Sequence, residues 1–210
     1  MTYQQLRSNR FLRIAAPALV AALVALPAIG FQGFPAGWKG TADRGSADAV
    51  QFTESGGMMH LNMGRVTATL YNSGWTKSGN YTYSARLTQE QKASHPVSYG
   101  IAFGGTGMGS GNEMYTYFLV RQAGEYYIAN RANGSSTAVV AWTADPAVNK
   151  EGADGKQENT LSVQVQGDNV IFSVNGKQVK TLPKSQVHTD GTLGIRVGHT
   201  LNVMVDQVKM

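Results

Sequence analysis

The chain contains no cysteine among its 210 residues. No disulfide can therefore support the fold, which must be held by its packed core alone. The same absence excludes cysteine nucleophiles, thiolate metal sites and a lipid anchor on an N-terminal cysteine.

Sequence motifs of several enzyme classes are missing as well. The glycine-rich stretch from Gly104 to Gly111 lacks the G-K-[ST] and G-x-G-x-x-G patterns, and a strand-like run follows it instead of a helix. These features argue against a phosphate-binding loop. The loop also fails the G-x-S-x-G pattern of serine hydrolases. Histidine pairs at H-x-H or H-E-x-x-H spacing are absent too, which favours separate surface positions over metal ligands. The four histidines are His60, His95, His188 and His199.

A strong excess of basic charge is found only at the N-terminus. The whole chain has 18 Lys and Arg against 13 Asp and Glu, a net charge of +5. Three arginines and no acids lie in residues 1–30, which leaves 15 basic against 13 acidic residues, or +2, for the remainder. This balance, without a Lys/Arg cluster, argues against nucleic acid or an anionic membrane surface as a partner.

The first thirty residues have the pattern of an export signal. Three arginines precede the apolar run 14–26, and the small residues Ala28 and Gly30 offer a cleavage site before Phe31. The apolar run is shorter than the about 20 residues that span a bilayer. We therefore expect residues 1–30 to be cleaved and the protein to be periplasmic or extracellular. A retained N-terminal anchor is the alternative.

Most of the chain after Val50 alternates between apolar and polar residues. Such a period of two is typical of half-buried strands. The clearest runs are YTYSARLT (81–88), VSYGIAF (97–103), LSVQVQ (161–166), VIFSV (170–174) and LNVMVDQVKM (201–210).

Short turn sequences separate these runs. Asn175-Gly176 predicts a tight hairpin, because both residues favour positive φ. The turn at 167–169 joins the two preceding runs, so residues 161–182 are expected to form a three-stranded meander. The segment 145–158 is polar and broken by glycine, which is typical of a loop.

These elements predict an all-β fold. Many short strands without a convincing helix indicate an antiparallel β-sandwich or a barrel. We expect one such domain over residues 49–210, preceded by a coil over residues 31–48.

The run LSVQVQGDNVIFSVNGKQV (161–179) resembles a hairpin of the concanavalin A-like lectin/glucanase jelly rolls, x-V-x-V-x-G-x-x-I-x-F-x-V-N-G. The run DGTLGIRV and the final strand resemble the end of those domains, and ESGGMMHLNM and SGNYTYSARLTQ resemble the bacterial 3-keto-disaccharide hydrolase-like branch. The likeness covers residues 50–210. It implies a jelly-roll sandwich of two curved antiparallel sheets, in which sugars usually meet the concave face or its bordering loops.

The resemblance also implies where a catalytic pair would stand. Hydrolytic members commonly carry their acids on one strand as E-x-D-x-x-E or E-x-D-x-E, and glycosidases need two carboxylates roughly 5 to 10 Å apart. The sequence has no such run: Glu113 stands alone, and Glu125 has no acidic partner two residues on. We therefore assign no catalytic residue, unless carboxylates from separate strands converge.

Tyrosine and arginine side chains form a candidate sugar-binding face. Aromatic rings stack on pyranose rings, and arginine donates to sugar hydroxyls. If Phe118 and Val120 face the core, the tyrosines and arginine that alternate with them share the opposite face, where Gly100 and Ala102 would leave room for a ligand. The opposite phase would instead place these tyrosines in the core. The candidate residues are Arg86, Tyr115, Tyr117, Arg121, Tyr127 and Arg131.

Three further residues have more than one interpretation. Trp142 ends an apolar run and is expected in the core, whereas Trp75 lies in a loop-like segment that would expose it. Asp206 alternates with valines in the last run and could face solvent. It could also help to hold a structural calcium, as in some relatives, but it is the one oxygen ligand that can be named.

The sequence thus predicts an exported carbohydrate-binding jelly roll without a recognisable catalytic carboxylate pair. One alternative is a keto-glycoside or glycoside hydrolase or lyase of the 3-keto-disaccharide hydrolase-like type. A second alternative is a structural or protein-interaction sandwich with no sugar site.

Overall fold

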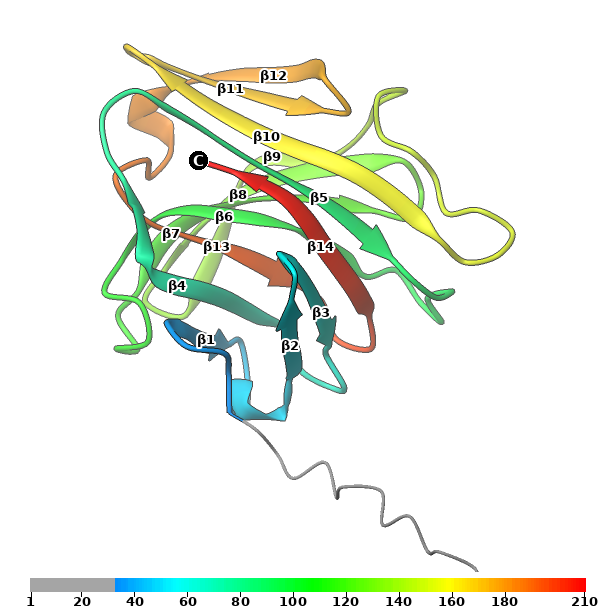
Figure 1. The fold of residues 1–210 in the computed structure, drawn as a ribbon. Helices are drawn as coiled ribbons and strands as arrows, with labels where there is room; N and C mark the ends of the chain where they lie inside the picture. The colour runs from blue at the N-terminus through cyan, green and yellow to red at the C-terminus, as the bar shows by residue number, and fades with distance from the viewer. Residues whose placement is uncertain (1–32) are drawn as a thin grey trace, which may run out of the picture. The chain divides into compact units, whose positions relative to one another are not determined.

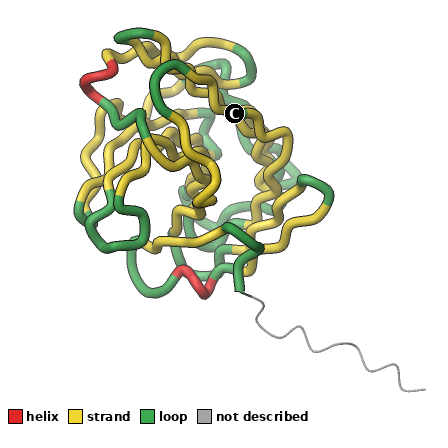
Figure 2. The backbone as a smooth tube through the Cα atoms, turned by 60° about the vertical axis from the view of Figure 1, so that its left-hand side comes forward, coloured by secondary structure: helices red, strands yellow, loops and turns green. Residues whose placement is uncertain are grey.

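The alternating runs form the strands of two antiparallel sheets. A computed structural model describes residues 33–210, which contain fourteen strands and two short 3₁₀ turns, η1 (Ala47–Ala49) and η2 (Lys184–Gln186). Figure 2 shows that almost all of this part of the chain is strand or loop. The predicted export signal at 1–30 lies outside the described residues. Over residues 33–210, no helix has the length and apolar character needed to cross a membrane.

Each sheet has seven strands. In spatial order, sheet A consists of β1 (Trp38–Ala42), β4 (Ala68–Lys77), β13 (Gly191–Val197), β6 (Ser98–Thr106), β7 (Met114–Arg121), β8 (Glu125–Ala132) and β9 (Ser135–Ala144). Sheet B consists of β12 (Lys177–Pro183), β11 (Asn169–Val174), β10 (Gln157–Gln166), β5 (Tyr81–Gln89), β14 (Asn202–Lys209), β3 (Met58–Asn62) and β2 (Gln51–Ser55).

The two sheets pack face to face in a sandwich (Figure 1). One core of buried side chains fills the space between them, and it takes residues from both sheets, for example Phe118 and Val120 from β7 and Leu161 and Phe172 from sheet B. Phe172 lies 5.2 Å from Phe118 between ring centroids, in an edge-to-face contact. Hydrophobic burial of this kind supplies the main stabilisation, since the chain has no disulfide.

The turn sequences take the conformations that were expected. Asn175 and Gly176 have φ of 52° and 76° and join β11 to β12, and Asn133 and Gly134 have φ of 49° and 78° and join β8 to β9. Strands β10, β11 and β12 pair in order, which confirms the meander.

The coil expected over residues 31–48 is corrected by the structure. Residues Trp38–Ala42 form strand β1, which pairs along its whole length with the start of β4 at the edge of sheet A. The Trp38 side chain is buried and meets Phe52 and Trp75 edge to face. The glycine-rich composition around this short strand hid its alternation.

Candidate functional site

The outer face of sheet A, which points away from sheet B, carries a second buried apolar cluster. Its members come from three neighbouring strands, and three partly buried side chains pack against them. The buried members are Ala102, Tyr115, Tyr117, Leu119 and Ala129, and the packed residues are Met108, Tyr127 and Trp142. An apolar cluster on the outside of a sandwich differs from an ordinary solvated face and marks a candidate binding surface.

On this face, aromatic rings and arginine side chains lie next to one another in a series that crosses the sheet. The Arg196 guanidinium lies 4.7 Å from the ring centroid of Tyr117, and the Tyr117 ring lies 6.1 Å from that of Tyr127. Tyr127 stacks on Trp142 at 4.9 Å with an interplanar angle of 23°. Arg121 lies 4.4 Å from the Trp142 ring. This series, which we call the aromatic row, extends from β13 to β9 and fixes the orientation of its rings.

Small residues on β6 allow the row to cross that strand. Arg196 is in register with Gly100, and Tyr117 is in register with Ala102, so no side chain longer than a methyl separates them. The glycine is also needed for strand packing, because a β-carbon at position 100 would lie 2.0 Å from the Phe118 carbonyl oxygen. Gly100 is therefore required because a β-carbon would collide with the backbone of β7.

Arg196 is buried and held by three partners. Its Nη2 donates to Asp43 Oδ2 at 2.6 Å, and its Nη1 donates to Thr69 Oγ1 at 3.0 Å and to the Tyr115 hydroxyl at 3.2 Å. Burial alone lowers the pKa of Arg196, but the charges of Tyr115 and Asp43 outweigh it and raise that pKa above its usual range. The guanidinium therefore stays charged, in one orientation, beside Tyr117.

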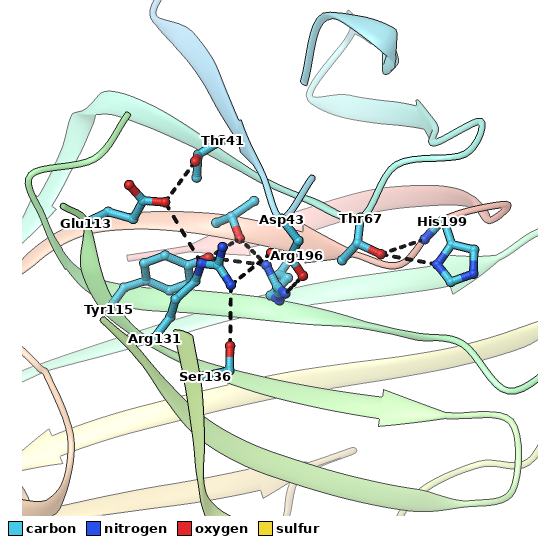
Figure 3. A network of polar contacts seen from close by, with 10 residues as sticks. Thr41, Asp43, Thr67, Glu113, Tyr115, Arg131, Ser136, Arg196 and His199 are labelled. Carbon is cyan, nitrogen blue, oxygen red and sulfur yellow. Dashed lines mark hydrogen bonds and ion pairs between the residues drawn. The ribbon is translucent and has the colours of Figure 1, made fainter. Parts of the chain in front are cut away.

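A second buried arginine, Arg131, extends this polar network (Figure 3). Its Nη1 lies 3.2 Å from Asp43 Oδ1, and its Nε lies 3.9 Å from Glu113 Oε1. Thr41 donates to the same Glu113 oxygen at 3.0 Å. Among the described residues, Glu113 Oε2 and Arg131 Nε have no hydrogen-bond partner. Asp43 therefore bridges the two buried arginines, while Glu113 is a second, more distant acid beside Arg131 and is only partly satisfied.

An open pocket adjoins the aromatic row. Its volume is about 270 Å³. It is lined by Thr67, Pro96, Val97, Ser98, Tyr117, Leu119, Tyr127, Trp142, Arg196, Gly198 and His199. A second hollow, of about 530 Å³ at the β10–β11 turn, has no aromatic side chain among its lining residues. The first pocket combines rings with polar groups and is the candidate functional site.

Five of the six residues predicted from the sequence lie on this face. Phe118 and Val120 do point into the core, and the tyrosines that alternate with them point outward. Only Tyr117 and Tyr127 line the pocket itself. The other three on this face are Tyr115, which bonds to Arg196, and Arg121 and Arg131, which are engaged by acids.

The grouping of Arg86 with these residues is corrected by the structure. Arg86 lies on β5, in sheet B, where its Nε donates to Asp206 Oδ1 at 2.7 Å and its Nη2 donates to Asp206 Oδ2. Alternation showed that Arg86 is on the polar side of its strand, but it could not show which sheet the strand joins. The same pairing occupies the Asp206 carboxylate, which had been considered as a calcium ligand.

Several residues of the site were missed from the sequence. Trp142 was expected in the core but lines the pocket, and Trp75, considered as an exposed platform, packs against Trp38 and the core. Arg196 stands between buried Ile195 and Val197, a single charge within an apolar strand, which was a usable signal for an outward-facing functional position. Nothing in the sequence indicated a role for Asp43, because this residue directly follows β1, which was predicted to be coil.

Carboxylates from separate segments do converge, around Arg131. Asp43 and Glu113 both approach this guanidinium, from segments 70 residues apart. Neither acid lines the pocket, and each is engaged by arginine or threonine. The two acids therefore form an ion network around the arginines, and they lie outside the pocket in which a glycosidic bond would have to be placed between an acid and a nucleophile.

Comparison with solved structures identifies the fold. A carbohydrate binding module, CBM66 from Bacillus subtilis, superposes with a TM-score of 0.61 at 14% identity, over 82% of this chain and 93% of that one. A Bacillus subtilis protein of unknown function with a galectin-like fold gives 0.58 at 13% identity, over 81% and 87%. Bacillus licheniformis beta-glucanase gives 0.56 at 13% identity, over 85% and 93%. The chain thus has the concanavalin A-like jelly-roll fold.

The sequence comparisons add no closer assignment. A scan against protein-family models finds no match, and a search of curated proteins finds none either. At identities of 13 to 14%, the solved structures show the fold alone and leave the branch within it open.

Proposed function

We propose that this protein binds carbohydrate in the pocket on the outer face of sheet A. One observation carries the proposal: Tyr127 and Trp142 share the lining of one pocket with the buried, charged Arg196. Sugar sites combine an aromatic surface for the apolar face of the ring with fixed donors for its hydroxyls.

The polar lining supplies both kinds of hydrogen-bonding group. Arg196 is a donor that its partners hold in place, and the hydroxyls of Thr67 and Ser98 can donate or accept. Because the arginine is oriented before a ligand arrives, binding loses little side-chain entropy. The volume of about 270 Å³ is at the small end of ligand pockets, which suits one or two sugar rings better than a long chain.

The fold and the expected location support the same proposal. The solved structures of this fold include a carbohydrate binding module and a beta-glucanase, so the scaffold holds sugars in other proteins. An export signal at residues 1–30 would place the protein in the periplasm or outside the cell, where glycans are found. N-terminal sequencing of the protein recovered from those compartments tests this part of the proposal.

The hydrolase alternative draws less support from the geometry. The two acids that converge, Asp43 and Glu113, both lie outside the pocket lining and approach Arg131. The non-binding alternative, a structural or protein-interaction sandwich, leaves the fixed arginine beside the rings without a role.

A glycan array tests the proposal. We expect the wild-type protein to bind a limited set of glycans, and Trp142→Ala and Tyr127→Ala each to lose about fivefold in affinity, since one stacked aromatic ring is worth roughly 1 kcal/mol. Arg86→Ala is the control on the other sheet and should bind as the wild type does. Unchanged melting temperatures for the variants would show that the loss is local.

Two results would contradict sugar binding at this face. One is no binding to any glycan, and the other is equal binding by the wild type and both aromatic variants. Incubation of the wild-type protein with 3-keto-glucosides tests the hydrolase alternative. Release of product would favour that alternative over sugar binding alone.

A further inference from the structure

His95 and His199 meet nitrogen to nitrogen at the rim of the pocket. Their Nε2 atoms are 2.7 Å apart, and their ring centroids are 4.8 Å apart with an interplanar angle of 28°. The centroid separation exceeds the nitrogen separation by about the width of one imidazole ring. The rings are therefore nearly coplanar and point head on, so both in-plane Nε2 positions address the same small volume.

The opposite nitrogen of each ring is held by a hydroxyl. His95 Nδ1 lies 2.9 Å from Ser94 Oγ, and His199 Nδ1 lies 3.3 Å from Thr67 Oγ1. Thr67 Oγ1 also accepts from the His199 backbone N–H at 3.2 Å, which fixes the hydroxyl beside the ring. A neutral imidazole that donates from Nδ1 has its Nε2 lone pair free. Metal-bound histidines donate their other ring N–H to an oxygen acceptor that fixes the tautomer, and the two hydroxyl oxygens can serve as such acceptors here.

Two neighbouring strands of sheet A bring these rings together, because the loop before β6 lies beside the end of β13, where the Gly198 N–H donates to the Ser98 carbonyl at 2.8 Å. His95 is exposed in the loop between β5 and β6, and His199 follows β13 and lines the pocket with Thr67. The two histidines are 104 residues apart in the sequence, so no local spacing could predict that they meet.

We propose that His95 and His199 bind one divalent transition-metal ion, of the class that prefers imidazole: Zn²⁺, Ni²⁺ or Cu²⁺. Metal–nitrogen bonds of about 2.0 to 2.1 Å at a tetrahedral angle separate the two nitrogens by about 3.4 Å. The present 2.7 Å has to open by less than 1 Å, which the exposed loop of His95 allows. The ion replaces the proton that bridges the rings, and that proton moves to Nδ1 of its own ring or leaves to solvent.

The described part of the chain supplies two ligands to this ion. In residues 33–210, no group of three or more His, Asp or Glu side chains is close enough to hold a metal. The remaining coordination positions belong to water or to an oxygen of a pocket ligand, as in sites that keep open positions for a ligand. The ion would add a Lewis acid at the edge of the pocket, and its binding does not depend on the sugar proposal.

Titration calorimetry of the untagged protein with ZnCl₂ and NiCl₂ tests the site. We expect one ion per chain, and a loss of at least about tenfold in affinity for His95→Ala and for His199→Ala, since outer-shell changes alone cost about 10- to 100-fold. His60→Ala is the matched control, because that ring lies on β3 beside Glu90. Thr67→Val should weaken binding while both ligands remain.

Electron paramagnetic resonance with Cu²⁺ gives a second readout. Coupling to two imidazole nitrogens in the wild type, and to one in each histidine variant, would support the proposal. Failure of the wild type to bind any of the three metals overturns it. Binding that His95→Ala and His199→Ala leave unchanged, or that His60→Ala abolishes, also overturns it. None of these results bears on sugar binding, so the two proposals fail separately.

Discussion

Each outer face of this sandwich carries an arginine paired with an aspartate, and the two pairs have different surroundings. On sheet B, Arg86 and Asp206 form a bidentate pair whose side chains are 29% and 14% exposed. On sheet A, Arg196 and Asp43 form a pair whose arginine is only 6% exposed, beside rings and a second buried arginine. The difference lies in the arginines: Arg86 is partly exposed to solvent, whereas Arg196 is covered by Tyr117 and the neighbouring strands, although Asp43 itself is 33% exposed.

This difference separates a surface ion pair from one that shapes a site. A solvated pair contributes little to stability, because water already satisfies both groups. A buried guanidinium cannot exchange partners without leaving a charge unpaired, so it stays in place. Arg196 is therefore suited to meet a ligand in a fixed geometry, whereas Arg86 is not.

The largest expected difference concerns the two aspartates. Asp43→Asn removes the counter-charge of Arg196 and one of the two acids beside Arg131, which should destabilise the fold by about 3 kcal/mol. For a chain of this size, that corresponds to about 6 to 12 °C in melting temperature. Asp206→Asn, the matched change on sheet B, should lower the melting temperature much less. Calorimetric melting of both variants measures this, and equal shifts would contradict the contrast.

An intermediate effect is expected from the removal of single hydroxyls. Tyr115→Phe leaves Thr69 Oγ1 and one Arg196 donor with a partner fewer in a buried place, which should cost about 1 to 2 kcal/mol. Thr88→Val removes a hydroxyl that contacts Glu158 at the surface of sheet B, and should change stability little. Urea unfolding followed by fluorescence compares the two. A larger loss for Thr88→Val would reverse the comparison.

The smallest effect is the acid dependence of the pair on sheet B. The hydrogen bond from Arg86 lowers the pKa of Asp206, so the folded state releases this proton more readily than the unfolded state does. The stabilisation is therefore complete above the unfolded pKa of about 3.9 and is lost as pH falls through the folded value. The stability difference between wild type and Asp206→Asn should shrink as pH falls from 5 to about 3. A difference that stays constant over this range would show that the pair has no such linkage.

Alternation along each strand made the phase of the tyrosines predictable. Phe118 and Val120 are buried in the core, so the residues between them had to point outward. Strand boundaries and hairpins also followed from local turn chemistry, as at Asn175-Gly176. These features depend on residues close together in the sequence, which is why sequence reasoning reached them.

The composition of the site depended on long-range pairing instead. Arg86 was grouped with the tyrosines because its strand alternates in the same way, but β5 pairs with β10 and β14 in the other sheet. His199 and Trp142 enter the pocket from strands and loops far from Tyr117 in the sequence. The period-two pattern shows on which side of its own strand a residue lies. Only the order of the strands in the two sheets decides which of those sides face the same pocket.

Strand β1 and Asp43, the residue after it, limit how far the N-terminus of the protein can be truncated. Asp43 reaches Arg196 across 153 positions of the sequence, so an early segment supplies the counter-charge for a late strand. A truncation that begins after residue 43 would keep thirteen of the fourteen described strands and still remove the acid that pairs with Arg196 and approaches Arg131. The shortest form of the domain that keeps this ion network therefore begins before β1.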